Sequence, residues 1–537
     1  MPKKSYFDNM EEITKEELFE GLLGYGMFAA KIPPFLTSKP FCDFCLNQKD
    51  SFFEKKEKGF IQYENMRNIN VPRALAIPNP IAYRNICNVL SENWEDLLQH
   101  FKDKTNGQLF KVSRIHIRKL DNSKTLFDIG YENNEEIEYE EEVEDEEEIE
   151  LSIGKKHLFE MNRKDIYTDD YPEPDLLIGK HFIVKADISN CFPSIYTHSI
   201  PWALVGKEHS KKHRDDKEWF NKLDKFTRNL KDAETHGILI GPHASNLVSE
   251  IVLVSVDDAM YKKGYSYIRN IDDYSFYAKN HQEAEKFLVD LTSELKKFSL
   301  TLNHKKTEIL KLPLASTEHW VRKINTFVFT NENRLLKLSE VRSYLDIALD
   351  LMQKNNENSA IVNYVVKVLS TKKLTNNAKS YYVKTMHHLV LIYPYLIHLL
   401  EDNIFKPFGV EIDEIKKITL DIFEIGKSKN LFEAKSYALY LAIKYQFSIE
   451  QNLYDVADNS RDCIFMLLAF LYDKKLNASQ SNIKKYKVLA EELSKNEMDQ
   501  YWLFVYEVLP KSKLNSHWKT MKEKNISFIK DDFNGFL

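Results

Sequence analysis

The chain has 537 residues, more than one hydrophobic core usually organises, so about three structural units are expected. Hydrophobic residues make up 43% and charged residues 29% of the chain, and glycine (15) and proline (16) are scarce, which excludes disordered, collagen-like and low-complexity proteins. The formal net charge is −6, but residues 132–150 hold thirteen Asp or Glu and no Lys or Arg, so the rest of the chain carries +7. A mildly basic body of this kind is compatible with a nucleic-acid partner.

The sequence carries no pattern typical of export or of membrane insertion. The first residues, Met1 to Asp8, are polar and lack the apolar stretch of a secretory signal, and no later apolar run has the length of a membrane span. Five cysteines in a long chain do not form a disulfide framework, and their odd number indicates a reducing compartment. We therefore expect a cytoplasmic protein without a membrane partner. Cys42 and Cys45 have the spacing of a zinc clip, but no second pair follows, so a structural role is expected.

The N-terminal unit is expected to span residues 1–180. Helical apolar spacing runs from Ser91 to Phe101, and residues 112–118 alternate like a strand with one basic face. The acidic segment near 132–150 repels itself and buries little, so a solvated insertion loop is expected. A second interpretation is that this loop imitates a nucleic-acid backbone and shields a basic cleft when substrate is absent.

The central unit is expected to span residues 181–330. Its signals follow the order strand, helix, hairpin, helix, strand. These segments are residues 181–187, 235–260, 265–277, 282–298 and 300–303. The first strand ends in Asp187, and the hairpin holds Asp272 and Asp273 at its tip. This order predicts an α+β fold in which helices pack on one face of an antiparallel sheet.

An all-α domain is expected at residues 331–537, because strand signals fade from about Leu336. Apolar residues recur there at three-to-four spacing, in segments parted by short polar connectors. The segments are Tyr344–Met352, Ala360–Leu369, Tyr381–Leu400, Ile415–Ile425, Ala434–Tyr445, Cys463–Tyr472 and Ile483–Leu493. Helices of this size in series favour a solenoid-like domain, although no clean sequence repeat is found. The most apolar run, Leu389–Leu400, contains Pro394 and is expected to be a core helix.

Three acids point to the chemistry of this chain. Nucleotidyl transfer spreads negative charge over the attacking and leaving oxygens, and two divalent cations can clamp both ends. Mg²⁺ prefers carboxylate oxygens, with water and substrate phosphate completing its shell. Asp187, Asp272 and Asp273 would supply the carboxylates if their two strands pair side by side. We therefore expect these three residues to be metal ligands and catalytic residues, with Mg²⁺ as the cofactor and Mn²⁺ as an alternative.

Residues near the acids extend this prediction. Phe192, five residues after Asp187, could lie beneath the sugar of an incoming deoxynucleotide and exclude a 2′-hydroxyl by steric clash. The glycines of the segment His236–Leu247, among them Gly241, allow close backbone approach before a helix begins. Lys306 lies near the end of the same unit and could protonate the leaving pyrophosphate or neutralise its charge.

With these residues in this order, the chain resembles reverse transcriptases over about residues 60 to 315. Four segments are similar to palm motifs A to D, in order: Asp187–Phe192, Gly237–Ser245, Tyr267–Asp273 and Asn303–Thr307. The segments similar to the fingers, where basic side chains meet the triphosphate, are Val71–Arg73, Pro78–Arg84, Arg114 and Arg118. The resemblance implies an α+β reverse-transcriptase fingers and palm fold. It also implies catalysis by Asp187, Asp272, Asp273 and Lys306, and dNTP binding by Phe192, Arg114, Arg118 and Gly241.

Two segments are most similar to the bacterial abortive-infection (Abi) reverse transcriptases of anti-phage defence: Ile195–Trp202 and Glu234–Ile238. This resemblance implies a cytoplasmic bacterial protein with a C-terminal HEAT-like helical domain and a homo-oligomeric assembly. It further implies template-independent polymerisation of dNTPs, primed by a tyrosine hydroxyl, so that the single-stranded DNA product stays covalently attached. The priming tyrosine is not identified among the 28 tyrosines, and Tyr6 and Tyr25 are candidates from the N-terminal side.

Two departures from template-copying relatives leave other functions open. Those relatives commonly have Pro-Gln where this chain has Leu239 and Ile240, and an aromatic residue where it has Asn270. An apolar Ile240 cannot make the polar contacts that a glutamine offers near a templating base, which argues against copying. The alternative is an RNA-templated reverse transcriptase of retron or group II intron type, with RNA as a partner. A third hypothesis is a polymerase-derived binding protein that has lost catalysis and recruits a partner through its helical domain.

Overall fold

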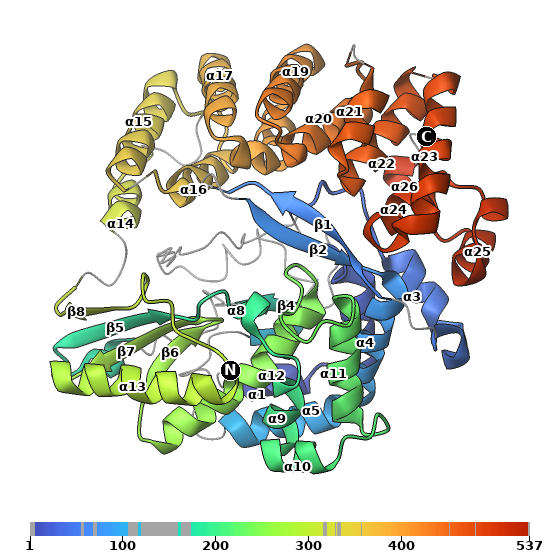
Figure 1. Cartoon of the computed structure of the whole chain (residues 1–537). Coiled ribbons are helices and arrows are strands. Elements are labelled where there is room, and N and C mark those ends of the chain that lie inside the picture. Colours follow the sequence, from blue (N-terminus) through green and yellow to red (C-terminus); the bar gives the residue numbers. More distant parts are fainter. Residues whose placement is uncertain are drawn as a thin grey trace.

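The computed structural model describes most of the chain. The described residues are 6–29, 31–54, 58–67, 72–105, 116–119, 159–162, 173–314, 319–327, 329, 335–355, 357–449, 452–477 and 479–534. Within these ranges the fold is mostly helical, with three small antiparallel sheets. In Figure 1 an arc of helices from α14 (His319–Asn325) to α26 (Asp531–Asn534) lies above a mixed unit of helices and sheet. The hairpin of β1 (Phe60–Asn65) and β2 (Arg73–Pro78) lies between the two (Figure 1).

Short helices and the β1–β2 hairpin form the N-terminal part, followed by two longer helices. The helices are α1 (Tyr6–Glu11), α2 (Lys15–Glu20), η1 (Gly21–Tyr25), α3 (Lys39–Leu46), η2 (Asp50–Phe53), α4 (Pro80–Glu92) and α5 (Trp94–Thr105). The helix predicted from Ser91 to Phe101 is wrong at its start, because Ser91 belongs to α4, which ends at Glu92, and α5 begins only at Trp94. The Asn93 side chain donates to the Val89 carbonyl at 2.8 Å, which ends α4.

The predicted basic strand is only partly described. Residues 116–118 belong to β3 (His116–Lys119), which pairs antiparallel with β4 (Phe159–Asn162). Residues 112–115 and the acidic segment 132–150 lie outside the described residues.

A four-stranded antiparallel sheet organises the central unit, in the order β6–β7–β5–β8. The strands are β5 (Phe182–Asp187), β6 (Tyr267–Asn270), β7 (Asp273–Ala278) and β8 (Glu308–Lys311). The helices are α7 (Glu173–Leu177), α8 (Cys191–Ser194), α9 (Ser199–Val205), α10 (Lys207–Lys212), α11 (Trp219–Leu230), α12 (His243–Lys262) and α13 (His281–Lys297). The strand that ends at Asp187, the hairpin and the helix after it are confirmed.

Two predicted boundaries of the central unit are wrong. The helix expected from 235 begins only at His243, because residues 235–242 form a loop whose Gly237 N–H donates to the Ile195 carbonyl at 2.9 Å. The strand expected at 300–303 is reduced to a single bridge between Leu302 and Ile188. Asn303 starts a turn there, since its side-chain oxygen accepts from the Lys305 N–H at 3.1 Å, and the strand forms later as β8.

The two faces of the central sheet differ in what covers them. Val184 of β5 and its partner Phe276 of β7 point into the main hydrophobic core, where Phe276 stacks on a ring of α13 at 4.3 Å. Ile183 points to the opposite face, which has only a small cluster of its own. Because side chains alternate along a strand, Asp187 and Asp273 share the face of Ile183. Both acids therefore lie on the face away from the main core and α13.

The described residues from 335 onward form helices joined by short connectors. They are α15 (Leu338–Lys354), α16 (Ser359–Ser370), α17 (Asn376–Ile392), η4 (Pro394–Leu399), η5 (Glu401–Phe405), α18 (Lys406–Phe408), α19 (Ile412–Ser428), α20 (Phe432–Tyr445), α21 (Leu453–Ser460), α22 (Cys463–Tyr472), η6 (Asp473–Asn477), α23 (Gln480–Asn496), α24 (Met498–Val508), η7 (Lys511–Lys513) and α25 (Ser516–Glu523). The helical character is confirmed, whereas the HEAT-like classification and the domain boundaries stay predictions. Among the described helices, none combines the length and the apolar character needed to cross a bilayer.

The predicted core helix at Leu389–Leu400 is wrong as a single element. Helix α17 ends at Ile392, and Pro394 opens the 3₁₀ segment η4. Proline lacks the N–H that would continue the α-helical ladder, so the chain changes helix type at this point.

The β1–β2 hairpin contacts both the central unit and the helical arc. From β2, the Ala76 N–H donates to the Ile240 carbonyl at 2.9 Å, in the loop that precedes α12. From the end of β1, the Asn65 amide donates to the Glu433 carboxyl group of α20 at 2.9 Å, and the Met66 N–H donates to the same group. The hairpin therefore joins the helical arc to the loop of the central unit.

Candidate active site

Asp187 lies at the end of β5, in the interior of the central sheet, and its side chain is 8% exposed. On one side, the N–H of Ile188 donates to the Asp272 carbonyl at 3.1 Å. On the other side, the Asp187 carbonyl accepts from the Asn303 N–H at 2.8 Å. Backbone bonds thus bring the predicted catalytic acids and the Asn303–Thr307 segment to one place.

Asp187 and Asp273 lie directly opposite each other in the β5–β7 register. The bond between Ile188 and Asp272 makes that neighbouring pair the hydrogen-bonded one. Asp187 and Asp273 therefore form the narrow, non-hydrogen-bonded kind of pair, with Cα atoms about 4.5 Å apart. Like charges at such positions repel each other, and a cation nearby relieves this repulsion.

Asp272 lies in the tight turn between β6 and β7, where the backbone is strained. The preceding residue, Ile271, has a φ of +52°. A β-branched residue rarely adopts this left-handed conformation, which costs about 1–3 kcal/mol and persists only where the surroundings hold it. Asp272 and Asp273 are both partly exposed.

Two further polar side chains contact the Asp187 carboxylate. Lys306 Nζ lies 3.1 Å from Oδ2, and Asn303 Nδ2 lies 3.4 Å from the same oxygen. Lys306 was expected near the leaving pyrophosphate; it lies beside the acid itself, where its charge balances one carboxylate. Sequence reasoning gave Asn303 no role, although its place at the start of the Asn303–Thr307 segment was the available signal.

The buried thiol of Cys191 lies near both acids. Burial is the main cause that raises the pKa of this thiol well above its ordinary value. The carboxylates of Asp272 and Asp187 raise the thiol pKa further, and the guanidinium of Arg269 lowers it. The carboxylate of Glu250 also raises the thiol pKa, so acids on both faces of the sheet act on Cys191.

The acids provide only some of the ligands that a metal ion needs. Among the described residues, no group of three or more His, Cys, Asp or Glu side chains is arranged to hold a metal ion. A preformed site of all three carboxylates of Asp187, Asp272 and Asp273 is therefore not seen. Mg²⁺ is commonly bound through one or two carboxylates, with water and substrate phosphate as its other ligands. Asp187 with one acid of the turn fits that ion.

The cysteine pair expected to be structural is indeed buried. Cys42 and Cys45 lie in α3 as free thiols, and burial is the main cause that raises both pKa values, that of Cys42 to about 12.

Phe192 lies in α8, shortly after the end of β5, and its partly buried ring packs against the main core. The glycines of the following loop are required by contacts within the protein. Gly237 has a φ of +82°, and a Cβ there would lie 2.8 Å from the Pro193 carbonyl oxygen. Gly241 has a φ of +123°, and a Cβ there would lie 3.3 Å from the Ala76 carbonyl oxygen. The part of Gly241 in dNTP binding stays a prediction.

The arginines expected to meet the triphosphate are not placed at the acids. Arg114 lies outside the described residues, and Arg118 lies in β3 with its side chain outside the described part. Arg84, from the fingers-like segment, is 7% exposed and donates to Asp50 at 2.6 Å, with its guanidinium 4.1 Å from the centre of the Phe53 ring. Arg84 therefore anchors the N-terminal fold.

The structure describes the side chain of one of the two candidate priming tyrosines. Tyr6 opens α1, and its side chain lies outside the described part. Tyr25 ends η1 and is partly buried, and burial is the main cause that raises its pKa. The carbonyl of the next residue, Gly26, accepts from the N–H of His243, the first residue of α12, at 2.8 Å. Tyr25 therefore lies beside the loop that precedes α12.

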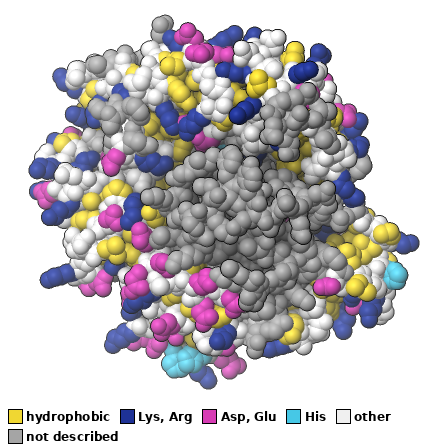
Figure 2. Space-filling view, turned by 180° about the vertical axis from the view of Figure 1, so that it is seen from behind, with side chains coloured by type: hydrophobic (Ala, Val, Ile, Leu, Met, Phe, Trp, Pro, Cys, Tyr) yellow, Lys and Arg dark blue, Asp and Glu magenta, His cyan; other side chains and the backbone are white. Residues whose placement is uncertain are grey.

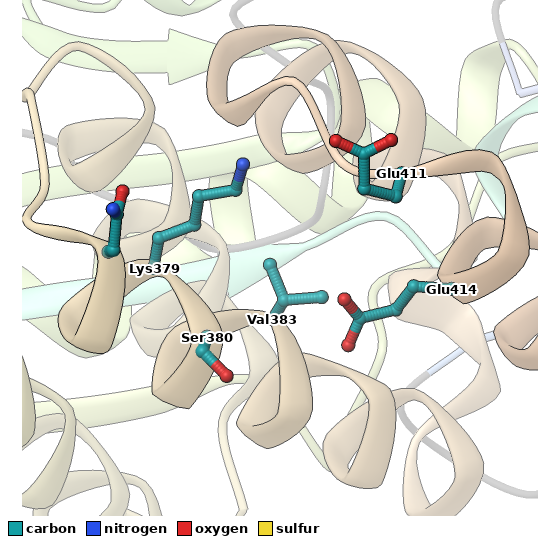
Figure 3. Close-up of a pocket in the computed structure, with 6 residues that line it drawn as sticks. Lys379, Ser380, Val383, Glu411 and Glu414 are labelled. Atoms are coloured by element: carbon teal, nitrogen blue, oxygen red, sulfur yellow. The ribbon is translucent and has the colours of Figure 1, made fainter.

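A pocket of about 190 Å³ lies in the helical arc, between α17 and the start of α19 (Figure 3), and none of its lining residues is a predicted site residue. Its lining residues are Asn376, Lys379, Ser380, Val383, Glu411 and Glu414. Lys379 Nζ donates to the Gly409 carbonyl at 3.0 Å. The pocket brings together no group that the predicted chemistry requires.

Charged side chains on the face seen in Figure 2 are mixed in sign. The Lys and Arg side chains of described residues lie scattered among acidic and hydrophobic ones and form no continuous basic patch there. Binding of a nucleic-acid backbone depends on clustered positive charge. The described part of this face therefore offers no such surface.

Comparisons with known proteins give no family assignment. No family model matches the chain, and no curated protein matches it. Among solved structures, the chain is similar to telomerase from Candida albicans in complex with a fragment of telomeric RNA, at 10% sequence identity and a TM-score of 0.20. The match covers 46% of this chain and 48% of the telomerase chain, so it spans about half of either protein. A similarity this weak carries no argument about function, which has to be inferred from the geometry around Asp187.

Proposed function

We propose that this chain is a metal-dependent DNA polymerase of the reverse-transcriptase superfamily. The observation that carries the proposal is that Asp187 lies opposite Asp273 at adjacent strand ends and that Ile188, the next residue, bonds the backbone of Asp272. Asp187 and Asp273 share the sheet face away from the main core. Asp187 and Asp272 hold Mg²⁺, Asp273 supports the metal site, and Lys306 supplies positive charge for the leaving pyrophosphate. When bound, the ion stabilises the negative charge that develops in nucleotidyl transfer.

The proposal extends to the choice of sugar. Phe192 lies in α8, five residues after the end of β5, and its partly buried ring packs against the core, which restricts its movement. A ring held near the sugar rejects a 2′-hydroxyl by clash, which favours deoxynucleotides.

The finer part of the proposal is template-independent, tyrosine-primed synthesis in anti-phage defence by a homo-oligomer. Leu239 is 4% exposed, and Ile240 packs against the core while its carbonyl accepts from Ala76. Neither side chain offers a polar group to a templating base, which supports synthesis without a template. Tyr25 is the first tyrosine to test as primer, because it lies beside this loop.

Incorporation of labelled dNTPs by the purified protein in Mg²⁺ tests the catalytic part. We expect product from the wild type and none from Asp187→Asn or Asp272→Asn, which remove charge and keep shape. Asp290→Asn is the matched control, since Asp290 lies on α13 and pairs with Lys263 and Tyr265 away from the site. Equal product from all four proteins would reject the proposal.

Sequencing the product tests the use of a template. With a defined RNA added, product that copies the RNA would establish the RNA-templated alternative, and product independent of the RNA supports the proposal. A wild type without product, whose Asp272→Asn variant still protects cells from phage, would establish the non-catalytic binding protein. Mass spectrometry of the product identifies the primer as a tyrosine peptide carrying a nucleotide.

A further inference from the structure

Arg269 is a fully buried arginine of β6, three residues before Asp272. Its side chain is 0% exposed and faces α12, where Glu250 and Asp257 are each 1% exposed. Glu250 and Asp257 are separated by about two helical turns, so they lie on the same face of α12. The three residues lie on the side of the sheet opposite Asp187, and sequence reasoning assigned a role to none of them.

All five N–H groups of the Arg269 guanidinium have partners among these residues and the backbone. Nε and Nη2 donate to Asp257 at 2.9 and 2.6 Å, and Nη1 and Nη2 donate to Glu250 at 3.0 and 2.9 Å. The fifth N–H donates from Nη1 to the Ile271 carbonyl at 2.8 Å. Tyr267 completes the network, because its hydroxyl donates to Asp257 at 2.7 Å.

The buried charges of the network stabilise one another, and the five hydrogen bonds fix the guanidinium. Burial is the main cause that raises the pKa of Asp257, and the charge of Arg269 opposes this rise. Removing Arg269 alone would leave two carboxylates in a dry interior, which strongly disfavours the folded state. The guanidinium is therefore held at one position and in one orientation.

The bond to Ile271 connects this network to the candidate metal site. The Ile271 carbonyl belongs to the peptide unit that continues into the nitrogen of Asp272. The orientation of that unit, with the φ of +52° at Ile271, sets the direction in which the Asp272 side chain leaves the backbone. From the sheet side, the Ile188 N–H holds the Asp272 carbonyl at 3.1 Å. The turn is thus held on both sides of Asp272.

We propose that Arg269, fixed by Glu250 and Asp257, is a positioning residue that orients Asp272 toward the cation site. Arg269 acts through the peptide unit before Asp272 and contacts neither nucleotide nor metal. The proposal rests on the proposed function only in taking Asp272 as a metal ligand; the control of the turn is independent of catalysis. Partners that orient metal ligands commonly change metal affinity or activity 10- to 100-fold when they are lost.

Arg269→Lys tests the proposal with the buried charge retained. A lysine has three donors on one atom, so it cannot span both carboxylates and the Ile271 carbonyl. We expect amide hydrogen exchange in the peptide of residues 267–278 to become at least about 10-fold faster, measured by mass spectrometry without metal. We also expect the Mg²⁺ concentration for half-maximal dNTP incorporation to rise about 10-fold, with the KM for dNTP little changed.

A compensated variant separates positioning from folding. The triple variant Glu250→Leu, Asp257→Leu, Arg269→Met replaces the charges by apolar groups, a change that commonly preserves stability, but it lacks the bond to Ile271. We expect it to unfold near the wild-type temperature while showing the faster exchange and the raised Mg²⁺ requirement. If Arg269→Lys does not fold, the triple variant alone tests the positioning role.

Glu401→Gln is the matched control for loss of a buried charge. Glu401 is 6% exposed in the helical arc and accepts from the Tyr440 hydroxyl at 2.8 Å. This variant should lower the unfolding temperature without changing exchange at 267–278 or the Mg²⁺ requirement.

The outcomes distinguish the two proposals. Two results would overturn the positioning role while the proposed function stands. One is a folded triple variant whose turn exchanges amide hydrogens at the wild-type rate, and the other is an active triple variant that requires no more Mg²⁺ than the wild type. Faster exchange in variants of a protein whose wild type incorporates no dNTP would support the control of the turn by Arg269 while the proposed function fails.

Discussion

Glu433 should make the stability of the protein depend on pH in a defined direction. This residue of α20 is 3% exposed and accepts from Asn65 and Met66 at the end of β1. Burial, the largest cause, raises the pKa of its carboxyl from 4.5 to about 7, although the hydrogen bond from Met66 opposes the rise. Between these two values the folded protein binds a proton that the unfolded chain does not bind. The free energy of unfolding therefore falls as pH rises from about 4.5 to about 7, and then levels off.

The size of this effect follows from the shift. A change of about 2.5 pKa units corresponds to about 3 kcal/mol, most of it lost between pH 5 and pH 8.5. Glu433→Gln removes the titration, while the Asn65 amide can turn its oxygen toward the new NH₂ group. We expect the variant to unfold like the wild type at pH 5 and to be about 2–3 kcal/mol more stable at pH 8.5.

Urea unfolding followed by tryptophan fluorescence, at both pH values, measures the difference between the two proteins, so that contributions of other titrating groups cancel. Glu285→Gln, at an exposed position of α13, is the control and should change neither value. A Glu433→Gln protein that is no more stable than the wild type at pH 8.5 would refute the reasoning.

Three further predictions concern the candidate site. Phe192→Ala should raise the incorporation of ribonucleotides relative to deoxynucleotides by 10-fold or more, on the order of 1.4 kcal/mol of discrimination, measured by competition; an unchanged ratio would remove Phe192 from sugar selection. Gly237→Ala should destabilise the fold by about 2–4 kcal/mol, because the strain of a positive φ adds to the steric cost of a Cβ 2.8 Å from a backbone oxygen. Gly179→Ala, with a φ of +72° and open space around it, should cost only about 1–2 kcal/mol in the same denaturation assay, and equal losses would contradict this. Lys306→Met should lower kcat at least about 10-fold yet leave stability within about 1 kcal/mol, since Lys306 is 56% exposed; an unchanged kcat would exclude it from the reaction.

Local patterns were sufficient to predict the strand that carries Asp187 and the hairpin that carries Asp272. The first segment is mostly apolar and ends at Asp187, and the second consists of two strand-like runs with the acids between them. Strand periodicity and the position of the turn therefore predict where in these elements the acids lie, without tertiary information. The strand at 300–303 could not be excluded in this way. Its interruption depends on the side chain of Asn303, which bonds its own turn and the Asp187 carboxylate.

The buried network of Arg269 could not be predicted from the sequence. Glu250 and Asp257 lie in a helix, where charged residues ordinarily face solvent, and nothing in the local pattern pairs them with an arginine of a later strand. Only packing of α12 against β6 brings the three together. The same holds for Glu433, whose partners Asn65 and Met66 lie far away in the sequence.

Site-directed cleavage by iron tests most directly whether Asp187 and Asp272 share a cation. Fe²⁺ supplied in place of Mg²⁺, with ascorbate and peroxide, generates hydroxyl radicals that cut the backbone next to the bound ion. We expect cuts near residues 185–190 and near residues 270–275 in the same protein, both suppressed by excess Mg²⁺ and both lost in Asp187→Asn. Cutting at only one of these segments, or cutting that persists in the variant, would contradict a shared site.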